Sequence, residues 1–192
     1  MGLFGFGSKT INYKNGGRYV GAVSNGEPHG EGTMYYGGGD RYIGSWWYGE
    51  PHGFGVYYFK NGERYEGQWL NGDRHGKGKY FFPDGSRYEG DFSLNKFSGK
   101  GVYYYPNGSR YEGDFRSDCL WGTGIMYYAN GNRYEGEWFN DKFQGKGFYY
   151  YADGRRYAGE FWNGKFHGRG VMIFPNGAKK EGLWKDGNYL GM

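Results

Sequence analysis

Short stretches in which aromatic side chains or glycines alternate with charged residues recur along the chain. Residues 64–69, Arg-Tyr-Glu-Gly-Gln-Trp, show the pattern. Side chains two residues apart point to the same face of a β-strand, so this stretch predicts a strand with Tyr65, Gly67 and Trp69 on one face. Residues 78–82, Gly-Lys-Tyr-Phe-Phe, predict a second short strand with rings on both faces.

This pair of segments repeats with a constant step of 23 residues. Its first tyrosine recurs at Tyr19, Tyr42, Tyr65, Tyr88, Tyr111, Tyr134 and Tyr157. A fixed period is the signature of a repeat array, whose end units are atypical. We therefore expect an apolar, glycine-containing tail over residues 1–9 and a single array over 10–192, with a half unit (10–18), seven full units (19–179) and a C-terminal half unit (180–192).

Turn sequences separate the segments. Asn-Gly, Asp-Gly and Pro-Asn-Gly supply the positive φ that a tight hairpin needs, so we expect sixteen short strands in an all-antiparallel, elongated sheet. Glycine in a strand lets a neighbouring ring lie across the backbone, which allows a ladder of rings to replace an aliphatic core. On this reasoning Tyr65, Gly67, Trp69, Gly76 and Gly78 have structural roles.

Composition narrows the class of protein. Of 192 residues, 42 are glycine and 45 are aromatic, which excludes a helix bundle with an aliphatic core and also excludes disorder. The net charge of +4 is spread along the chain, so we expect no nucleic-acid partner. One cysteine, no secretion signal and no apolar run as long as a membrane span favour a reducing compartment, the cytoplasm.

The repeat resembles a known family. Residues 65–69 (Tyr-Glu-Gly-Gln-Trp), 72–78 (Gly-Asp-Arg-His-Gly-Lys-Gly) and 83–85 (Pro-Asp-Gly) show nearly the full pattern of the MORN repeat, the membrane occupation and recognition nexus. The resemblance covers about residues 10–184. Ser98, Trp121 and Gln144 depart from it, because they replace the histidine of the motif.

This resemblance implies a twisted, single-layer sheet of tandem β-hairpins. It also implies a scaffold that organises cytoskeletal, ciliary or membrane-associated assemblies and that often dimerises. Some members of the family were proposed to bind phosphoinositides, and others carry a fused enzyme domain. No segment outside the repeats is long enough for such a domain here, so we expect a non-enzymatic protein that is associated with the cytoskeleton or with the axoneme of a cilium.

The repeat gives little indication of a catalytic site or a metal site. His29, His52, His75 and His167 occupy one repeat position, and like positions two strands apart lie about 10 Å from each other, too far to share a zinc ion. No nucleotide-binding loop is present. Cys119, at an expected hairpin tip, has no histidine near it in the sequence. We expect no catalytic residue, metal or cofactor.

An alternative function is binding of anionic phospholipids. The candidate lipid-binding residues form one column of the repeat: Arg41, Arg64, Arg87, Arg110, Arg133 and Arg156. Basic residues contribute about 1 kcal/mol each near an anionic membrane. However, a column of glutamates shares that face and reduces the positive potential of the arginines: Glu66, Glu89, Glu112 and Glu135. Gly2 fits a myristoylation signal only weakly, and an apolar tail that caps the first strand or is disordered is favoured.

The expected hairpin tips differ between the two halves of the chain. The first three units carry residues 27–28 (Glu-Pro), 50–51 (Glu-Pro) and 73–74 (Asp-Arg), whereas later units carry basic and apolar residues. Exposed rings beside lysine are typical of interface anchors. We therefore predict a partner-binding surface at Phe97, Leu120, Trp121, Phe143 and Phe166. In the alternative interpretation these rings fold back onto the sheet.

The open end of such a sheet favours association. Residues 189–192 (Tyr-Leu-Gly-Met) are expected to dock on a second copy, giving a homodimer through the C-terminal end. A carbohydrate-binding β-solenoid is disfavoured because such repeats are shorter and secreted. The sequence thus predicts a protein-binding scaffold, with peripheral phosphoinositide binding as the alternative.

Overall fold

The computed structural model describes residues 8–192, and this part of the chain contains strands and no helix. The strands are β1 (Lys9–Asn12), β2 (Arg18–Ser24), β3 (Glu27–Tyr35), β4 (Arg41–Trp47), β5 (Glu50–Tyr58), β6 (Arg64–Leu70), β7 (Asp73–Phe81), β8 (Arg87–Ser93), β9 (Lys96–Tyr104), β10 (Arg110–Arg116), β11 (Cys119–Tyr127), β12 (Arg133–Phe139), β13 (Lys142–Tyr150), β14 (Arg156–Trp162), β15 (Lys165–Ile173), β16 (Lys179–Lys185) and β17 (Asn188–Gly191). The expected all-β fold of tandem antiparallel hairpins is confirmed. The candidate myristoylation site at Gly2 lies outside the described residues.

The number of strands differs from the expected sixteen, since 17 are found among the described residues. The additional strand is β17, which pairs with β16 through Trp184 and Tyr189. Asp186 and Gly187 form the turn between them, with φ of 50° and 88°. This Asp-Gly pair is itself a hairpin signal, which extends the C-terminal half unit by one strand.

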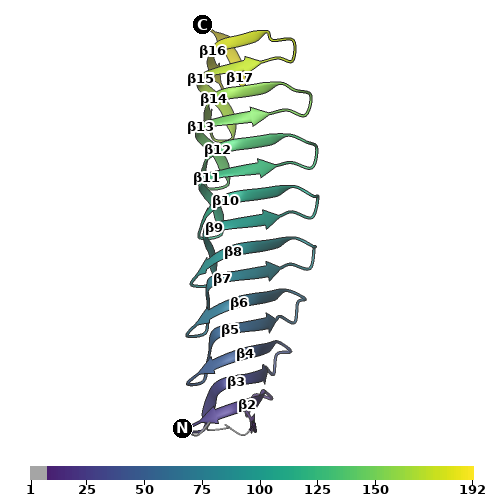
Figure 1. Cartoon of the computed structure of the whole chain (residues 1–192), viewed down its shortest axis with the longest axis vertical. Helices are drawn as coiled ribbons and strands as arrows, with labels where there is room; N and C mark the ends of the chain where they lie inside the picture. Colours follow the sequence, from purple (N-terminus) through teal and green to yellow (C-terminus); the bar gives the residue numbers. More distant parts are fainter. Residues whose placement is uncertain (1–7) are drawn as a thin grey trace, which may run out of the picture. The chain divides into compact units, whose positions relative to one another are not determined.

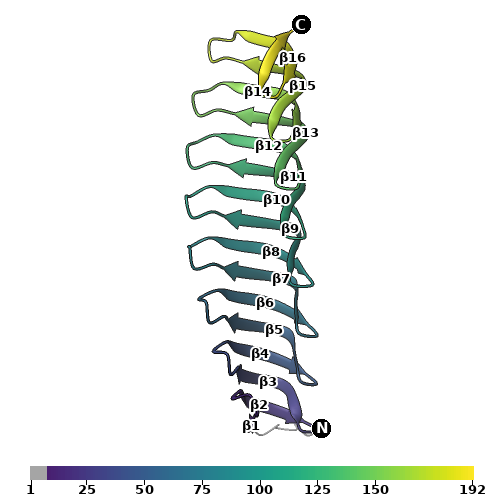
Figure 2. The same cartoon turned by 180° about the vertical axis from the view of Figure 1, so that it is seen from behind.

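The chain divides into two compact units, one ending at Lys96 and the other beginning at Phe97. In the first unit β1 to β8 pair in chain order, and in the second β9 to β17 do the same (Figures 1 and 2). Every pairing within a unit is antiparallel. The boundaries given above for the tail, half units and full units stay a prediction.

One hairpin illustrates the construction of each repeat. Leu70 pairs with Asp73 across the two-residue turn Asn71-Gly72, whose φ angles of 49° and 81° suit asparagine and glycine. The register then shifts between Gly67 and Trp69, where β7 carries a bulge at Gly76. A five-residue loop leads to the next repeat, closed by the bond from Phe82 N–H to Ser86 O (3.0 Å).

The expected hairpin tips are therefore wrong by two residues. Residues 27–28, 50–51 and 73–74 open the second strand of each hairpin, as do residues 96–97, 142–143 and 165–166. The turns lie just before them, at Asn25-Gly26 and Asn71-Gly72, for example, because residues there adopt the positive φ that a two-residue turn needs. Cys119 is likewise the first residue of β11, opposite Arg116, and not part of a turn.

The core is a ladder of rings on one face of the sheet. Tyr65 is fully buried, and its ring covers Gly67 and Gly78, where a Cβ atom would overlap it. Its hydroxyl donates to Gln68 O (2.7 Å). Trp69 lies edge-on to Tyr65 and to Tyr42 of the preceding repeat, with ring centroids 5.1 and 5.2 Å apart. The fully buried side chains are Tyr19, Tyr42, Tyr65, Tyr88, Tyr111, Tyr134 and Tyr157. We call this side of the sheet the tyrosine face.

Candidate protein-binding surface

Four of the five residues proposed to bind a partner share one repeat position on the tyrosine face: Phe97, Leu120, Phe143 and Phe166. Leu120 is buried. The Phe143 ring stacks on Tyr134 at 3.8 Å, and the Phe166 ring stacks on Tyr157 at 3.9 Å. These two rings lie on the sheet, as the alternative interpretation held. A role in partner binding stays a prediction.

Trp121 points to the other face, because it follows Leu120 in the same strand. Its ring lies 4.5 Å from the Phe139 ring, and the Arg116 guanidinium lies over it at 4.8 Å. The sequence interpretation grouped Trp121 with the phenylalanines, but the structure separates it from them. A single surface therefore does not contain all five residues.

A groove of about 300 Å³ opens on the tyrosine face of the second unit. Leu120 and Phe143 form part of its wall. The remaining lining residues are Tyr105, Met126, Tyr128, Trp138, Asp141, Lys142 and Gly164. We call this feature the aromatic groove. It combines an apolar floor with tyrosine hydroxyls and a charged rim, which is the usual composition of a recognition site.

The tyrosine hydroxyls of the groove are protonated at neutral pH. Burial raises the pKa of Tyr105 to about 12, with smaller contributions from Tyr103 and Asp141. Burial also raises the pKa of Tyr128. These hydroxyls therefore carry a proton that they can donate at neutral pH, for example to the carbonyl of a bound segment.

Sequence reasoning missed the tyrosines of the groove. Tyr105 and Tyr128 are the last aromatic residues of their runs and begin the loops that join repeats. The same position carries Tyr36, Phe59, Phe82, Tyr105, Tyr128, Tyr151 and Phe174. The recurrence of an aromatic residue at this repeat position was the signal in the sequence that could have identified the tyrosines of the groove. Tyr103 and Tyr105 lie 4.7 Å apart, and Tyr149 and Tyr151 lie 4.8 Å apart, so the rings continue along this face.

The arginine column lies on the opposite face, where it is partly neutralised. Arg64 lies 4.2 Å over the Phe81 ring and forms an ion pair with Glu66 (3.6 Å). Arg110 likewise lies over Tyr127 at 4.4 Å and pairs with Glu112 (2.7 Å). Ion pairs also join Arg87 to Glu89 and Arg133 to Glu135. Lipid binding by this column stays a prediction.

The ends of the arginine column differ from its middle. Arg41 lies over the Tyr58 ring at 4.4 Å, but Ile43 stands where later repeats have glutamate. Arg156 is exposed, and Ala158 occupies the corresponding position beside it. The guanidinium groups of Arg41 and Arg156 therefore have no glutamate at this position in their own strand.

Carboxylates on this face stabilise the bulges. Asp114 Oδ2 accepts from Thr123 N–H (2.9 Å), and Glu137 Oε1 accepts from Lys146 N–H (2.9 Å). Partial burial raises the pKa of Asp114, but hydrogen bonds from Lys100 and Thr123 outweigh it and hold that pKa below its ordinary value. Asp114 and Glu137 therefore have a structural role, because their carboxylates bind backbone N–H groups at the bulges.

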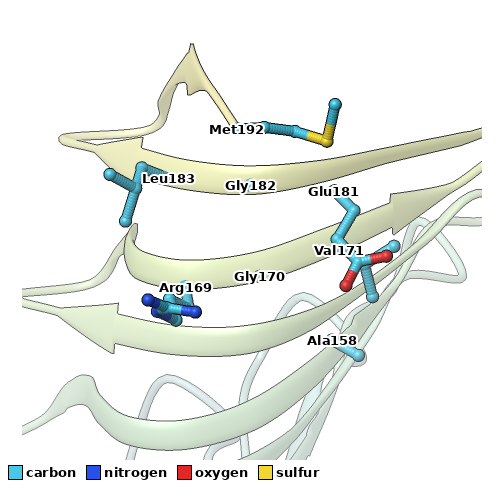
Figure 3. A pocket seen from close by; sticks show the side chains of 8 residues that line it. All are labelled: Ala158, Arg169, Gly170, Val171, Glu181, Gly182, Leu183 and Met192. Carbon is cyan, nitrogen blue, oxygen red and sulfur yellow. The ribbon is translucent and has the colours of Figure 1, made fainter.

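Within residues 8–192, no three histidine, cysteine, aspartate or glutamate side chains are arranged to hold a metal ion. No helix there is long and apolar enough to cross a membrane. Figure 3 shows a second pocket, of about 490 Å³, beside β16. It is lined by Ala158, Arg169, Gly170, Val171, Glu181, Gly182, Leu183 and Met192, and it contains none of the predicted partner-binding residues.

The comparisons with known proteins agree with the repeat geometry. The family description that matches is the MORN repeat, over residues 19–41, 42–64, 65–87, 88–110, 111–133, 134–155 and 157–179. No curated protein matches the sequence.

Solved structures resemble the chain in fold. The TCP domain of Drosophila melanogaster SAS-4, solved in complex with a proline-rich motif of Ana2, is 15% identical with a TM-score of 0.50, covering 93% of this chain and 90% of that one. The TCP10c domain of Drosophila Sas-4 is 16% identical with a TM-score of 0.42, covering 93% and 99%. At 15% identity the likeness to the first of these domains concerns the fold alone.

Proposed function

Because the chain belongs to the MORN repeat family, we propose that it is a non-enzymatic scaffold that binds other proteins through the aromatic groove. The observation that carries the proposal is the groove itself. Leu120, Met126 and Phe143 form apolar walls, while Tyr105 and Tyr128 add hydroxyl donors. Rings that are already ordered by the sheet lose little entropy when a partner binds.

We infer that the partner presents a proline-rich segment. Such segments adopt an extended helix whose exposed carbonyls and flat rings suit grooves lined by aromatic side chains. The Drosophila TCP domain, which shares the fold, was solved with a proline-rich motif bound. The assembly that we propose is cytoskeletal or ciliary, and the proposed location is the cytoplasm.

The test is capture of partners from a cytoskeletal extract by the full chain and by matched variants. Tyr105→Ala combined with Tyr128→Ala removes the hydroxyls and rings of the groove, and is expected to reduce bound partner about tenfold or more. Phe139→Ala is the control, because Phe139 is an exposed ring on the opposite face. Octaproline peptide is expected to compete for the wild-type chain. Equal capture by all three proteins would show that the groove is not the binding site.

Binding of anionic phospholipid is the alternative. It is supported by the column Arg41, Arg64, Arg87, Arg110, Arg133 and Arg156, with Arg41 and Arg156 lacking a glutamate two residues further on. Because Glu66, Glu112 and Glu135 pair with their arginines, we expect the full chain to remain at the bottom of a flotation gradient with phosphoinositide vesicles at physiological salt. Flotation with these vesicles but not with neutral ones would favour the lipid function.

We further propose that two copies associate at the C-terminal end. There β17 pairs with residues 183–185 of β16, and Leu190 on β17 is exposed. An exposed edge strand of this kind is a site for pairing with another chain. A monomer in light scattering at tens of micromolar would exclude this dimer.

A further inference from the structure

An exposed group of rings stands on the first unit, opposite the tyrosine face. Trp47 and Tyr48 are 50% and 52% exposed, and their rings meet edge-on at 4.9 Å. The His29 ring lies 4.7 Å from Trp47 and 5.0 Å from Tyr48. We call these three residues the Trp47 cluster. Exposed clusters of large rings are uncommon on a surface that contacts only water.

The backbone holds Tyr48 in an unfavourable conformation. Its φ is 42°, in the left-handed region that bulky residues rarely adopt. Asparagine, which tolerates this region, stands at the same turn position at Asn25, Asn71 and Asn163. A bond from Gly49 N–H to Pro28 O (2.9 Å) pins the turn against β3 and so brings Tyr48 beside His29. The chain thus keeps a tyrosine where asparagine fits better.

Three glutamates stand at strand positions next to those of the cluster. Glu50 is the register partner of Trp47, and Glu27 precedes Pro28 at the pinned turn. Glu31 accepts a hydrogen bond from Ser45 Oγ (2.5 Å). All three carboxylates are exposed, and none has an ion-pair partner in the part of the chain that the structure describes. A ring surface beside unpaired carboxylates attracts cations.

The second unit shows such a cation in place at the corresponding position. Trp121 and Phe139 occupy the repeat positions of His29 and Trp47, and their rings lie 4.5 Å apart. The Arg116 guanidinium lies over Trp121 at 4.8 Å. In the first unit Ser24 holds the position of Arg116, so the Trp47 cluster has no arginine of its own there.

We propose that the Trp47 cluster binds an arginine-bearing segment of a partner protein. The guanidinium takes the place that Arg116 has in the second unit, over the His29 ring and beside Trp47, and Glu27 and Glu50 pair with its charge. The cluster is a different surface from the aromatic groove and lies in the other unit. The inference therefore goes beyond the proposed function, and its test does not involve the groove.

The chain itself offers a matched control. Trp162 occupies the position of Trp47 and is 57% exposed. Lys142 and Lys165 hold the positions of Glu27 and Glu50 around it, and Lys142 Nζ donates to Asn163 Oδ1 (2.6 Å). The same ring therefore stands in basic surroundings, which repel an arginine.

The test is a titration of the isotope-labelled full chain with tetra-arginine peptide, followed by nuclear magnetic resonance. The indole N–H signal of Trp47 and the amide signal of Gly49 are expected to shift. Tetracitrulline, which has the same shape without charge, is expected to leave them in place. Trp47→Ser combined with Tyr48→Asn converts this turn to the sequence of residues 24–26, and is expected to weaken binding about tenfold. Trp162→Ser is expected to bind as the wild type does.

A second variant guards against misfolding of the first. Glu27→Gln combined with Glu50→Gln leaves every ring in place, and is expected to weaken binding at low salt about threefold. The proposal fails if wild-type Trp47 and Gly49 signals do not move with tetra-arginine at millimolar concentration. It also fails if tetracitrulline moves them equally, or if Trp162→Ser loses as much binding as the Trp47 and Tyr48 variant.

Discussion

Replacing Gly55 with alanine is expected to lower the free energy of unfolding by about 3 kcal/mol. The Tyr42 ring lies across Gly55, and a Cβ atom there would overlap the ring and its hydroxyl. Tyr42 is fully buried and donates to Ser45 O (2.9 Å), so it has little room to move. The Trp69 indole also donates to Gly55 O (3.3 Å), which spreads the displacement to the next repeat. Urea unfolding followed by circular dichroism measures the change.

Gly38 provides the control for this substitution. It belongs to the same unit, has no atom within 4 Å of an added Cβ, and does not have a positive φ. Gly38→Ala is expected to change the free energy of unfolding by about 0.5 kcal/mol or less. Equal urea midpoints for the two variants would contradict the claim that the core tyrosines need glycine beneath them.

Raising the pH from 10 to 12 is expected to unfold the chain cooperatively. Burial raises the pKa of Tyr36, Tyr80, Tyr105 and Tyr157 to about 12, above the ordinary value of 10.0. A raised pKa means that the folded state holds its protons more tightly than the unfolded state. The stability gained in this way is complete below pH 10 and is lost as the pH rises through 12. Tyrosinate absorbance and circular dichroism are expected to change together.

Tyr105→Phe tests the contribution of one of these tyrosines to the alkaline transition. The substitution keeps the ring and removes the ionisable hydroxyl. It is expected to raise the alkaline midpoint while leaving the urea midpoint at pH 7 nearly unchanged. An unchanged alkaline midpoint would mean that ionisation of Tyr105 does not limit stability there.

Much of the fold was predictable because the alternation within each segment and the 23-residue period both indicate short antiparallel strands. The 23-residue period and the spacing of Tyr65, Gly67 and Trp69 predicted strands with a ring face. The missing side chain of Gly78 predicted that a ring covers the backbone. The strands and the ring-covered glycines depend only on period-two alternation and on the positions of glycine. Both can therefore be recognised in a single sequence.

The site was less predictable because it depends on where the turns fall and on contacts between strands. The sequence interpretation placed Leu120 and Trp121 together at a hairpin tip, whereas both lie in β11, where alternation directs them to opposite faces. Nor does the sequence show that Phe143 stacks on Tyr134, since that contact joins two strands.

The nearest-neighbour pairing of the strands has a consequence for biosynthesis. Within each unit every strand pairs with those adjacent to it in the chain, so few contacts join distant parts of the sequence. Low contact order favours rapid folding, in contrast to most all-β proteins. Each hairpin finds the edge made by its predecessor already formed, and the array grows in the direction in which the ribosome delivers it.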